Sequence, residues 1–263
     1  MNKEEKKIIV QKLLPAFIDG GNVSIKLRKK GLIKNMKSDN TPVTNGDIEV
    51  NNILTKAIKT LTPNIPIISE ETSENKNKIN LSNFWLIDPI DGTYDYVNNG
   101  EEFTLNAALI INNKPSLGII NAPKKNRLFY SYDFGESYEI NGKEKIKLDG
   151  KKKTNLNEVK AVSYSDNLKP EIIKIHEKYR VTSFTKMKSS LKFCVIAASD
   201  FDLYAAEARA CEWDVAAGHA ILLHAGGLIN DFEGKEITYG KKDFKNTSII
   251  LRRSKNLWVS SWE

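Results

Sequence analysis

Residues 85–93 constrain the fold of this chain more than any other stretch. They read Trp-Leu-Ile-Asp-Pro-Ile-Asp-Gly-Thr, an apolar run typical of a buried strand, followed by a turn shaped by Pro89 and Gly92. Asp88 and Asp91 lie three residues apart on this turn, so their carboxylates can point at one spot. Because their repulsion there is tolerable only when a cation neutralises it, the turn indicates a metal site at the end of a strand.

Two further acidic positions could complete such a site. Glu70 and Glu71 come at the end of a short apolar strand at 67–68, and Asp214 is followed by small residues at 216–218 that would let a helix pack closely behind it. Taken singly, these acids could be solvated loop residues or a helix cap. Taken together, oxygen ligands without grouped cysteine or histidine indicate a hard cation, Mg²⁺ before Mn²⁺, and make a zinc site unlikely.

The same turn offers what a phosphate group needs. If a helix begins near Gly92, the N–H groups of Gly92, Thr93 and Tyr94 point outward without partners in that helix, and such an end binds anions. Gly92 also lets a phosphate oxygen approach the backbone. Metal ligands and a phosphate-binding helix end at one turn favour metal-assisted hydrolysis of a phosphate ester.

Composition narrows the partners. The 40 lysines and arginines exceed the 33 acidic residues and give a net charge of +7, but they are spread along the chain, so we expect a small phosphorylated metabolite as partner and no nucleic acid polymer. Two cysteines predict a reduced, cytoplasmic protein without a disulfide framework. No signal peptide and no apolar run long enough to span a membrane is visible. We expect a monomer or a homodimer.

Periodicity predicts an α+β lobe at 1–150, followed by an α/β lobe at 151–263, joined near 143–156 into one catalytic unit. The first lobe contains an antiparallel meander. A loop is expected at 38–42 and an exposed segment at 72–83. The expected helices are 4–18, 46–60, 170–178, 189–198 and 214–225. The last of these overlaps the longest weakly polar stretch, 215–229, which reads as a buried helix. The expected strands are 67–68, 85–88, 103–111, 116–122, 127–132, 137–140, 159–163, 181–184 and 201–205.

The acidic motifs, in this order along the chain, resemble the lithium-sensitive, magnesium-dependent phosphatase superfamily of the inositol monophosphatases. The resemblance rests on Glu70-Glu71, on residues 88–93 and on residues 213–218. It implies a layered αβαβα sandwich of the sugar-phosphatase type. Within the superfamily, residues 41–47, 100–106 and 189–194 are most similar to the CysQ-type 3′(2′),5′-bisphosphate nucleotidases.

The resemblance also implies roles for individual residues. Two or three Mg²⁺ ions per site are expected, with Li⁺ as an inhibitor. Thr93, with Asp47 or Glu70, would position the attacking water. The implied metal ligands are Glu70, Asp88, the Ile90 carbonyl, Asp91 and Asp214; the implied substrate-binding residues are Glu70, Asp91, Gly92, Thr93, Tyr94, Ser189, Lys192 and Asp214.

The expected activity is removal of the 3′-phosphate of adenosine 3′,5′-bisphosphate, which gives AMP and phosphate. Lys192 suits a second phosphate. Glu207, however, stands where inositol monophosphatases keep a hydroxyl-binding acid, and Ala206 replaces an arginine common in CysQ-type sequences, although Arg209 matches another basic position of some relatives. Two alternatives stay open: an inositol or other sugar phosphatase, and a homologue that binds RNA or a partner without turnover.

Overall fold

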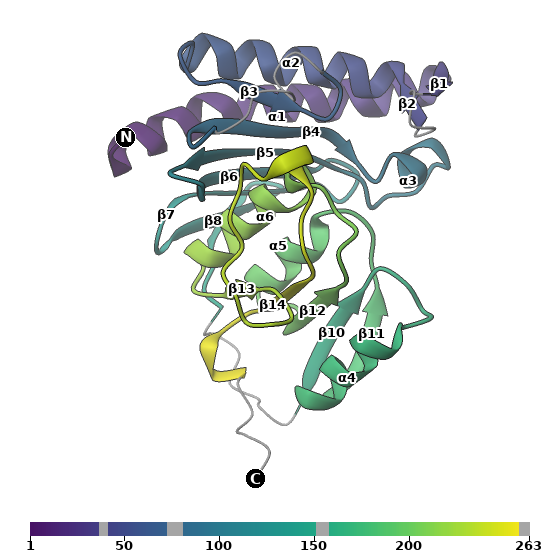
Figure 1. Ribbon diagram of the computed structural model, residues 1–263. Helices are drawn as coiled ribbons and strands as arrows, with labels where there is room; N and C mark the ends of the chain where they lie inside the picture. The colour runs from purple at the N-terminus through teal and green to yellow at the C-terminus, as the bar shows by residue number, and fades with distance from the viewer. Residues whose placement is uncertain (37–41, 73–80, 151–157, 258–263) are drawn as a thin grey trace.

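Helices and sheets alternate in five layers in the computed structural model, which describes residues 1–36, 42–72, 81–150 and 158–257 (Figure 1). Helices α1 (Lys3–Lys30) and α2 (Asn45–Leu61) cover the outer face of a seven-stranded sheet. Helices α5 (Leu191–Ala197) and α6 (Glu212–His224) lie between this sheet and a five-stranded sheet, and α4 (Pro170–Lys178) covers the outer face of the latter. The predicted αβαβα sandwich is confirmed.

The seven-stranded sheet follows chain order. β3 pairs with β4 in parallel, and every later pair is antiparallel, which confirms the predicted meander. Its strands are β3 (Ile67–Ser69), β4 (Phe84–Asp91), β5 (Thr104–Ile111), β6 (Lys114–Ala122), β7 (Arg127–Asp133), β8 (Glu136–Asn141) and β9 (Glu144–Lys147).

Strand β4 is apolar at consecutive positions because both of its faces are covered. Trp85 and Ile87 belong to the cluster beneath α1 and α2, whereas Phe84 and Leu86 belong to the cluster that contains α5 and α6. A strand buried on both faces reads as a continuous apolar run instead of an alternating one.

The second sheet is mixed. Its strands, in spatial order, are β11 (Val181–Lys186), β10 (Val159–Ser163), β12 (Leu203–Ala206), β14 (Ile249–Arg252) and β13 (Leu228–Asn230). β10 is parallel to both of its neighbours, and β14 is antiparallel to both of its own. The smaller elements are a two-stranded hairpin of β1 (Lys34–Met36) and β2 (Pro42–Thr44), helix α3 (Thr93–Val97), and 3₁₀ turns η1 (Lys242–Phe244) and η2 (Lys255–Leu257).

One apolar cluster reaches from the first sheet to the second. It contains Phe84 and Leu86 of β4, much of α5 and α6, Tyr204 of β12 and Leu251 of β14. The middle helices therefore belong to both sheets. The division into lobes at residue 150 stays a prediction, and this shared core supports its reading as one catalytic unit.

Two expected helices differ from the observed ones in extent. The first runs to Lys30 instead of ending at 18, because Gly20, Gly21 and Ser24 keep the helix against the sheet; a Cβ on Gly21 would lie only 2.6 Å from Asn121 Nδ2. The stretch 215–229 is not one helix. Helix α6 ends at His224, the backbone of Gly226 is left-handed (φ +92°), and the chain continues as β13.

Smaller differences concern element ends. The expected helix at 189–198 begins only at Leu191, because Ser189 has a left-handed backbone (φ +51°). The expected connection at 143–156 contains β9. Residues 37–41 of the expected loop, 73–80 of the expected exposed segment and 151–157 of the connection lie outside the described residues.

Candidate functional site

The turn after β4 is shaped by Gly92. This residue adopts φ +87° and caps α3, and an added Cβ would lie 3.3 Å from the carbonyl oxygen of Glu102. A side chain would be strained in that conformation. The pairing of β4 with β5 also shifts register between Asp88 and Asp91, so a bulge separates the two aspartates, both of which remain paired with β5.

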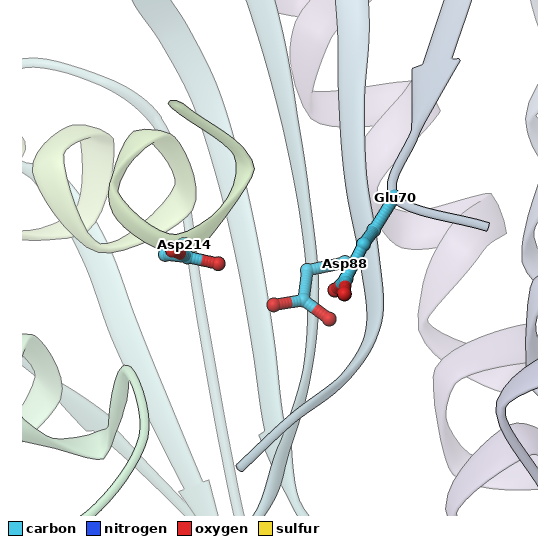
Figure 2. A group of neighbouring side chains, drawn as sticks. All are labelled: Glu70, Asp88 and Asp214. Carbon is cyan, nitrogen blue, oxygen red and sulfur yellow. The ribbon is translucent and has the colours of Figure 1, made fainter. Parts of the chain in front are cut away.

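Three carboxylates meet at the ends of three elements. Glu70 follows β3, Asp88 lies in β4 and Asp214 lies in the first turn of α6, and one oxygen of each lies within 4.8 Å of the others. Figure 2 shows the Asp88 side chain between the other two. Asp91 lies beside this group: it lines the same cavity as Asp214, and the Ser190 hydroxyl contacts both Asp91 Oδ2 and the carbonyl oxygen of Asp214. The fold therefore brings together the four acids predicted as metal ligands.

The electrostatics of this cluster favour a cation. Burial, and next the neighbouring carboxylates, raise the pKa of Asp88 well above its ordinary value and that of Asp214 to about 7. Asp88 Oδ1 is buried and has no hydrogen-bond partner among the described residues. An oxygen-only donor set with excess negative charge and an unused buried ligand atom suits Mg²⁺.

Thr93 and Asp47 lie together beside this cluster. The Thr93 hydroxyl lies 3.4 Å from Asp47 Oδ1 and 3.1 Å from the carbonyl oxygen of Ile90. Asp47 is itself held by a capping box, in which the backbone N–H and the hydroxyl of Thr44 donate to Asp47 Oδ2 over 2.8 and 2.6 Å. Burial raises the pKa of Asp47, and the bonds from Thr44 partly oppose that rise.

Ser190 joins the elements of the cluster, and sequence reasoning missed it. Its hydroxyl lies 2.5 Å from Asp91 Oδ2 and 2.8 Å from the carbonyl oxygen of Asp214, and it accepts a bond of 2.9 Å from Asn106 Nδ2. The only signal in the sequence was its position next to Ser189. Nothing in the local pattern tells which of two adjacent serines faces the acids.

A cavity of about 260 Å³ opens beside Asp91, Gly92 and Asp214. Its lining includes the predicted residues Tyr94, Ser189 and Lys192, together with Tyr204, Glu207 and Arg209. The Tyr94 side chain is 76% exposed, which leaves its backbone as the part nearest to the turn. Asp47, Glu70, Asp88 and Thr93 are not among the residues that line the cavity.

Lys192 is a buried cation in this cavity. Its ammonium group donates to the carbonyl oxygen of Ser189 and lies 5.4 Å from the centre of the Tyr204 ring. Burial lowers the pKa of Lys192 to about 8, although the nearby carboxylate of Asp91 opposes this shift. Among the described residues this lysine forms no salt bridge with a carboxylate, and a buried ammonium group of this kind is suited to receive an anionic group of a ligand.

Comparison with known proteins gives consistent results. The model of the inositol monophosphatase family matches residues 7–259. The 3′(2′),5′-bisphosphate nucleotidase CysQ of Buchnera aphidicola is 39% identical over 207 residues, which cover 77% of this chain and 76% of the relative. The protein of the same name from Escherichia coli strain K12 is 33% identical over 210 residues, which cover 79% and 83%.

Solved structures share the fold. The crystal structure of CysQ from Bacteroides thetaiotaomicron, a bacterial member of the inositol monophosphatase family, matches with a TM-score of 0.75 and 25% identity. The match covers 92% of this chain and 96% of that one. Among the described residues, no helix is both long and apolar enough to cross a membrane.

Proposed function

This chain belongs to the inositol monophosphatase family, and on that basis we propose that it is a metal-dependent 3′(2′),5′-bisphosphate nucleotidase. The reaction is removal of the 3′-phosphate of adenosine 3′,5′-bisphosphate by water, which gives AMP and phosphate. The observation that carries the proposal is a cavity lined by Asp91 and Asp214 and by the buried residue Lys192, with Asp214 also belonging to the carboxylate cluster of Glu70 and Asp88.

The acidic cluster is the proposed metal centre. Glu70, Asp88, the Ile90 carbonyl, Asp91 and Asp214 would hold two or three Mg²⁺ ions. Mg²⁺ held there would polarise the phosphate ester and make a water molecule at the site more acidic. The unpartnered Oδ1 atom of Asp88 and the raised pKa values of Asp88 and Asp214 support this assignment.

The residues next to the cluster would orient the attacking water. The hydrogen of the Thr93 hydroxyl is directed to Asp47 or to the carbonyl oxygen of Ile90, so the lone pairs of Thr93 Oγ1 can accept a hydrogen bond from water. That bond turns the remaining lone pair of the water toward phosphorus. Asp47 or Glu70 takes part by holding the hydroxyl or by accepting the proton.

The turn and the cavity would hold the substrate. The backbone of residues 91–94 receives the scissile phosphate, because Gly92 exposes the main chain there. Ser189 and Lys192 contact the rest of the nucleotide, with the Lys192 ammonium group directed to the second phosphate. Free cysteines at 194 and 211 support a reducing, cytoplasmic location for the reaction.

Phosphate release from a substrate panel tests the proposal. The purified protein is assayed in Mg²⁺ with adenosine 3′,5′-bisphosphate, inositol 1-phosphate and fructose 1,6-bisphosphate, each with and without Li⁺. We expect the nucleotide to be turned over most efficiently and Li⁺ to inhibit. Efficient turnover of inositol 1-phosphate without turnover of the nucleotide would overturn the assignment.

A second candidate is an inositol or other sugar phosphatase, favoured by the Glu207 carboxylate at the cavity wall. The same panel separates the two. A non-catalytic RNA- or partner-binding role would instead require salt-sensitive RNA binding by a protein that releases phosphate from none of the substrates.

A further inference from the structure

Two separate segments line the cavity wall away from the acidic cluster, and a third contacts them from outside the cavity. Tyr164 follows β10, and Glu207 and Arg209 follow β12; Lys169, the N-terminal cap of α4, contacts Glu207 without lining the cavity. All three segments belong to the five-stranded sheet or its outer helix, whereas Glu70 and Asp88 belong to the seven-stranded sheet. Substitutions in this wall can therefore alter substrate preference without altering the metal centre.

Both oxygens of the Glu207 carboxylate contact neighbouring side chains. The Tyr164 hydroxyl donates to it and lies 2.9 and 3.0 Å from its two oxygens, and the Lys169 ammonium group lies 2.7 Å from Oε1. Burial alone would raise the pKa of Glu207, but Lys169, a backbone hydrogen bond and Tyr164 together outweigh burial and lower it. Glu207 is thus an ionised carboxylate whose charge is paired with a lysine at the protein surface.

Arg209 depends on the same contacts. Its guanidinium group lies 4.1 Å from the centre of the Tyr164 ring, a stacked cation–π geometry, and the Tyr164 hydroxyl is the group that Glu207 holds. Arg209 is also close enough to Lys192 to lower the pKa of that lysine. With Glu207 neutralised by Lys169, two cations of like charge determine the potential at this end of the cavity.

We propose that Glu207 is a positioning residue and not a substrate ligand. Its contacts with Lys169 and Tyr164 keep a free carboxylate out of the cavity and hold the ring on which Arg209 stacks. This end of the cavity therefore selects a second anionic group of the substrate over a ring hydroxyl. The inference rests on the proposed nucleotidase function and assigns Lys169 and Tyr164 to substrate selection.

A double-mutant cycle tests the inference with AMP as probe, because AMP keeps the phosphate that this wall is proposed to select. We measure AMP affinity by calorimetry in Mg²⁺ for the unmodified chain, Lys169→Ala, Glu207→Gln and the double variant. Lys169→Ala leaves a free carboxylate in the cavity and should weaken AMP binding about tenfold. The double variant, which lacks that charge, should bind AMP within about twofold of the unmodified chain. Lys174→Ala removes the same charge from an exposed position on α4 and is the matched control.

Each outcome bears on the inference. If Lys169 contacts the phosphate directly, the double variant binds AMP as weakly as Lys169→Ala, and the inference fails. If Glu207 binds a substrate hydroxyl, Glu207→Gln alone weakens AMP binding by a similar factor, and the inference also fails. AMP affinity is measured without turnover, so this test is independent of catalysis. If the double variant recovers AMP affinity but the unmodified protein does not cleave adenosine 3′,5′-bisphosphate, the proposed function fails and the inference about Glu207 stands.

Discussion

Asp88 lies in the middle of the acidic cluster, with one oxygen buried and without a hydrogen-bond partner among the described residues. A buried ionised group is costly unless it is paired or coordinates a metal. At the scale of single residues, the site is therefore defined by charges whose partners the described chain does not supply. Lys192, on the cavity side, is a buried cation whose ammonium group contacts the Ser189 carbonyl and the Tyr204 ring.

Replacement of Asp91 by asparagine should lower kcat by about 10²-fold or more, because it removes a metal ligand together with the charge that holds the metal. The measurement is phosphate release from adenosine 3′,5′-bisphosphate over a range of Mg²⁺ concentrations. Near-normal turnover at saturating Mg²⁺ would refute the assigned role.

Replacement of Lys192 by alanine should raise KM for the bisphosphate nucleotide about tenfold and leave a nucleoside 3′-monophosphate nearly unaffected, because only the former offers a second phosphate. The two substrates are compared under identical conditions. Equal losses on both would remove Lys192 from substrate selection.

The pH dependence of KM gives an independent check on the same residue. The pKa of Lys192 is lowered to about 8, so its positive charge is present below that pH and is lost as the pH rises through it. KM for the bisphosphate should therefore rise between about pH 7 and pH 9 in the unmodified chain. In Lys192→Ala this rise should be absent; an identical rise in both proteins would assign it to another group.

At the scale of elements, the site depends on the alignment of β3, β4 and α6, whose ends each contribute one carboxylate. Small residues on α6 allow this alignment, as expected from residues 216–218. A Cβ on Gly118 of β6 would lie 2.3 Å from the carbonyl oxygen of Ala217, and a Cβ on Gly218 would lie 2.3 Å from the Phe193 ring. The helix therefore packs in backbone contact with the sheet.

Gly118→Ala should push α6 away from the sheet, lower the stability of the protein by about 1–3 kcal/mol and raise the Mg²⁺ concentration needed for half-maximal activity. Thermal unfolding and Mg²⁺ titration measure the two effects. Gly20→Ala is the matched control on the opposite face, where the new methyl group would meet side-chain carbons only. Unchanged Mg²⁺ dependence in Gly118→Ala would contradict the proposed coupling.

The converging carboxylates should also make the metal-free protein sensitive to pH. Their folded pKa values are raised, so the folded chain binds protons more tightly than the unfolded chain, and stability falls as the pH rises toward and through about 7, the pKa of Asp214. The free energy of unfolding in EDTA should thus be lower at pH 8 than at pH 6.5, and Mg²⁺ at pH 8 should restore it.

Buried histidines act in the opposite direction at lower pH. Burial lowers the pKa of His219 to about 3 and that of His224 to about 4, so their contribution to stability rises with pH up to about 6.5, the ordinary pKa of histidine, and is level above it.

Comparison with Asp214→Asn isolates the effect of the carboxylates: in this variant the free energy of unfolding should decline much less between pH 6.5 and pH 8. A decline of equal size in the variant would point to other groups.

At the scale of the whole molecule, α5 and α6 are shared by the two sheets, so neither lobe can bury its apolar face alone. We expect a single cooperative unfolding transition, with coincident urea curves from far-ultraviolet circular dichroism and tryptophan fluorescence. The fragment 1–150, which lacks both helices, should be insoluble or unfolded. A stable, folded 1–150 fragment would contradict the reading as one unit.

Much of the architecture could be predicted from the sequence. The meander was visible because turn signals separate its strands, and α2 was placed within one residue of its observed ends. β13 was missed because its first residues were assigned to the buried helix expected at 215–229, and β14 was missed because a strand of four residues carries little periodicity. The extent of α1 was missed because tertiary packing, and not propensity, keeps its glycines helical.

The sequence by itself determined the acidic motifs, their order and the kind of cation they suit, because ligand chemistry depends on residue type and short spacing. Only the tertiary structure decided which neighbours these residues have. Ser190 meets Asp91 across 99 residues, and Tyr164 meets Glu207 across 43. Such contacts depend on how the two sheets pack around α5 and α6. From the sequence, Glu207 could bind a substrate hydroxyl; in the folded protein its carboxylate is paired with Tyr164 and Lys169.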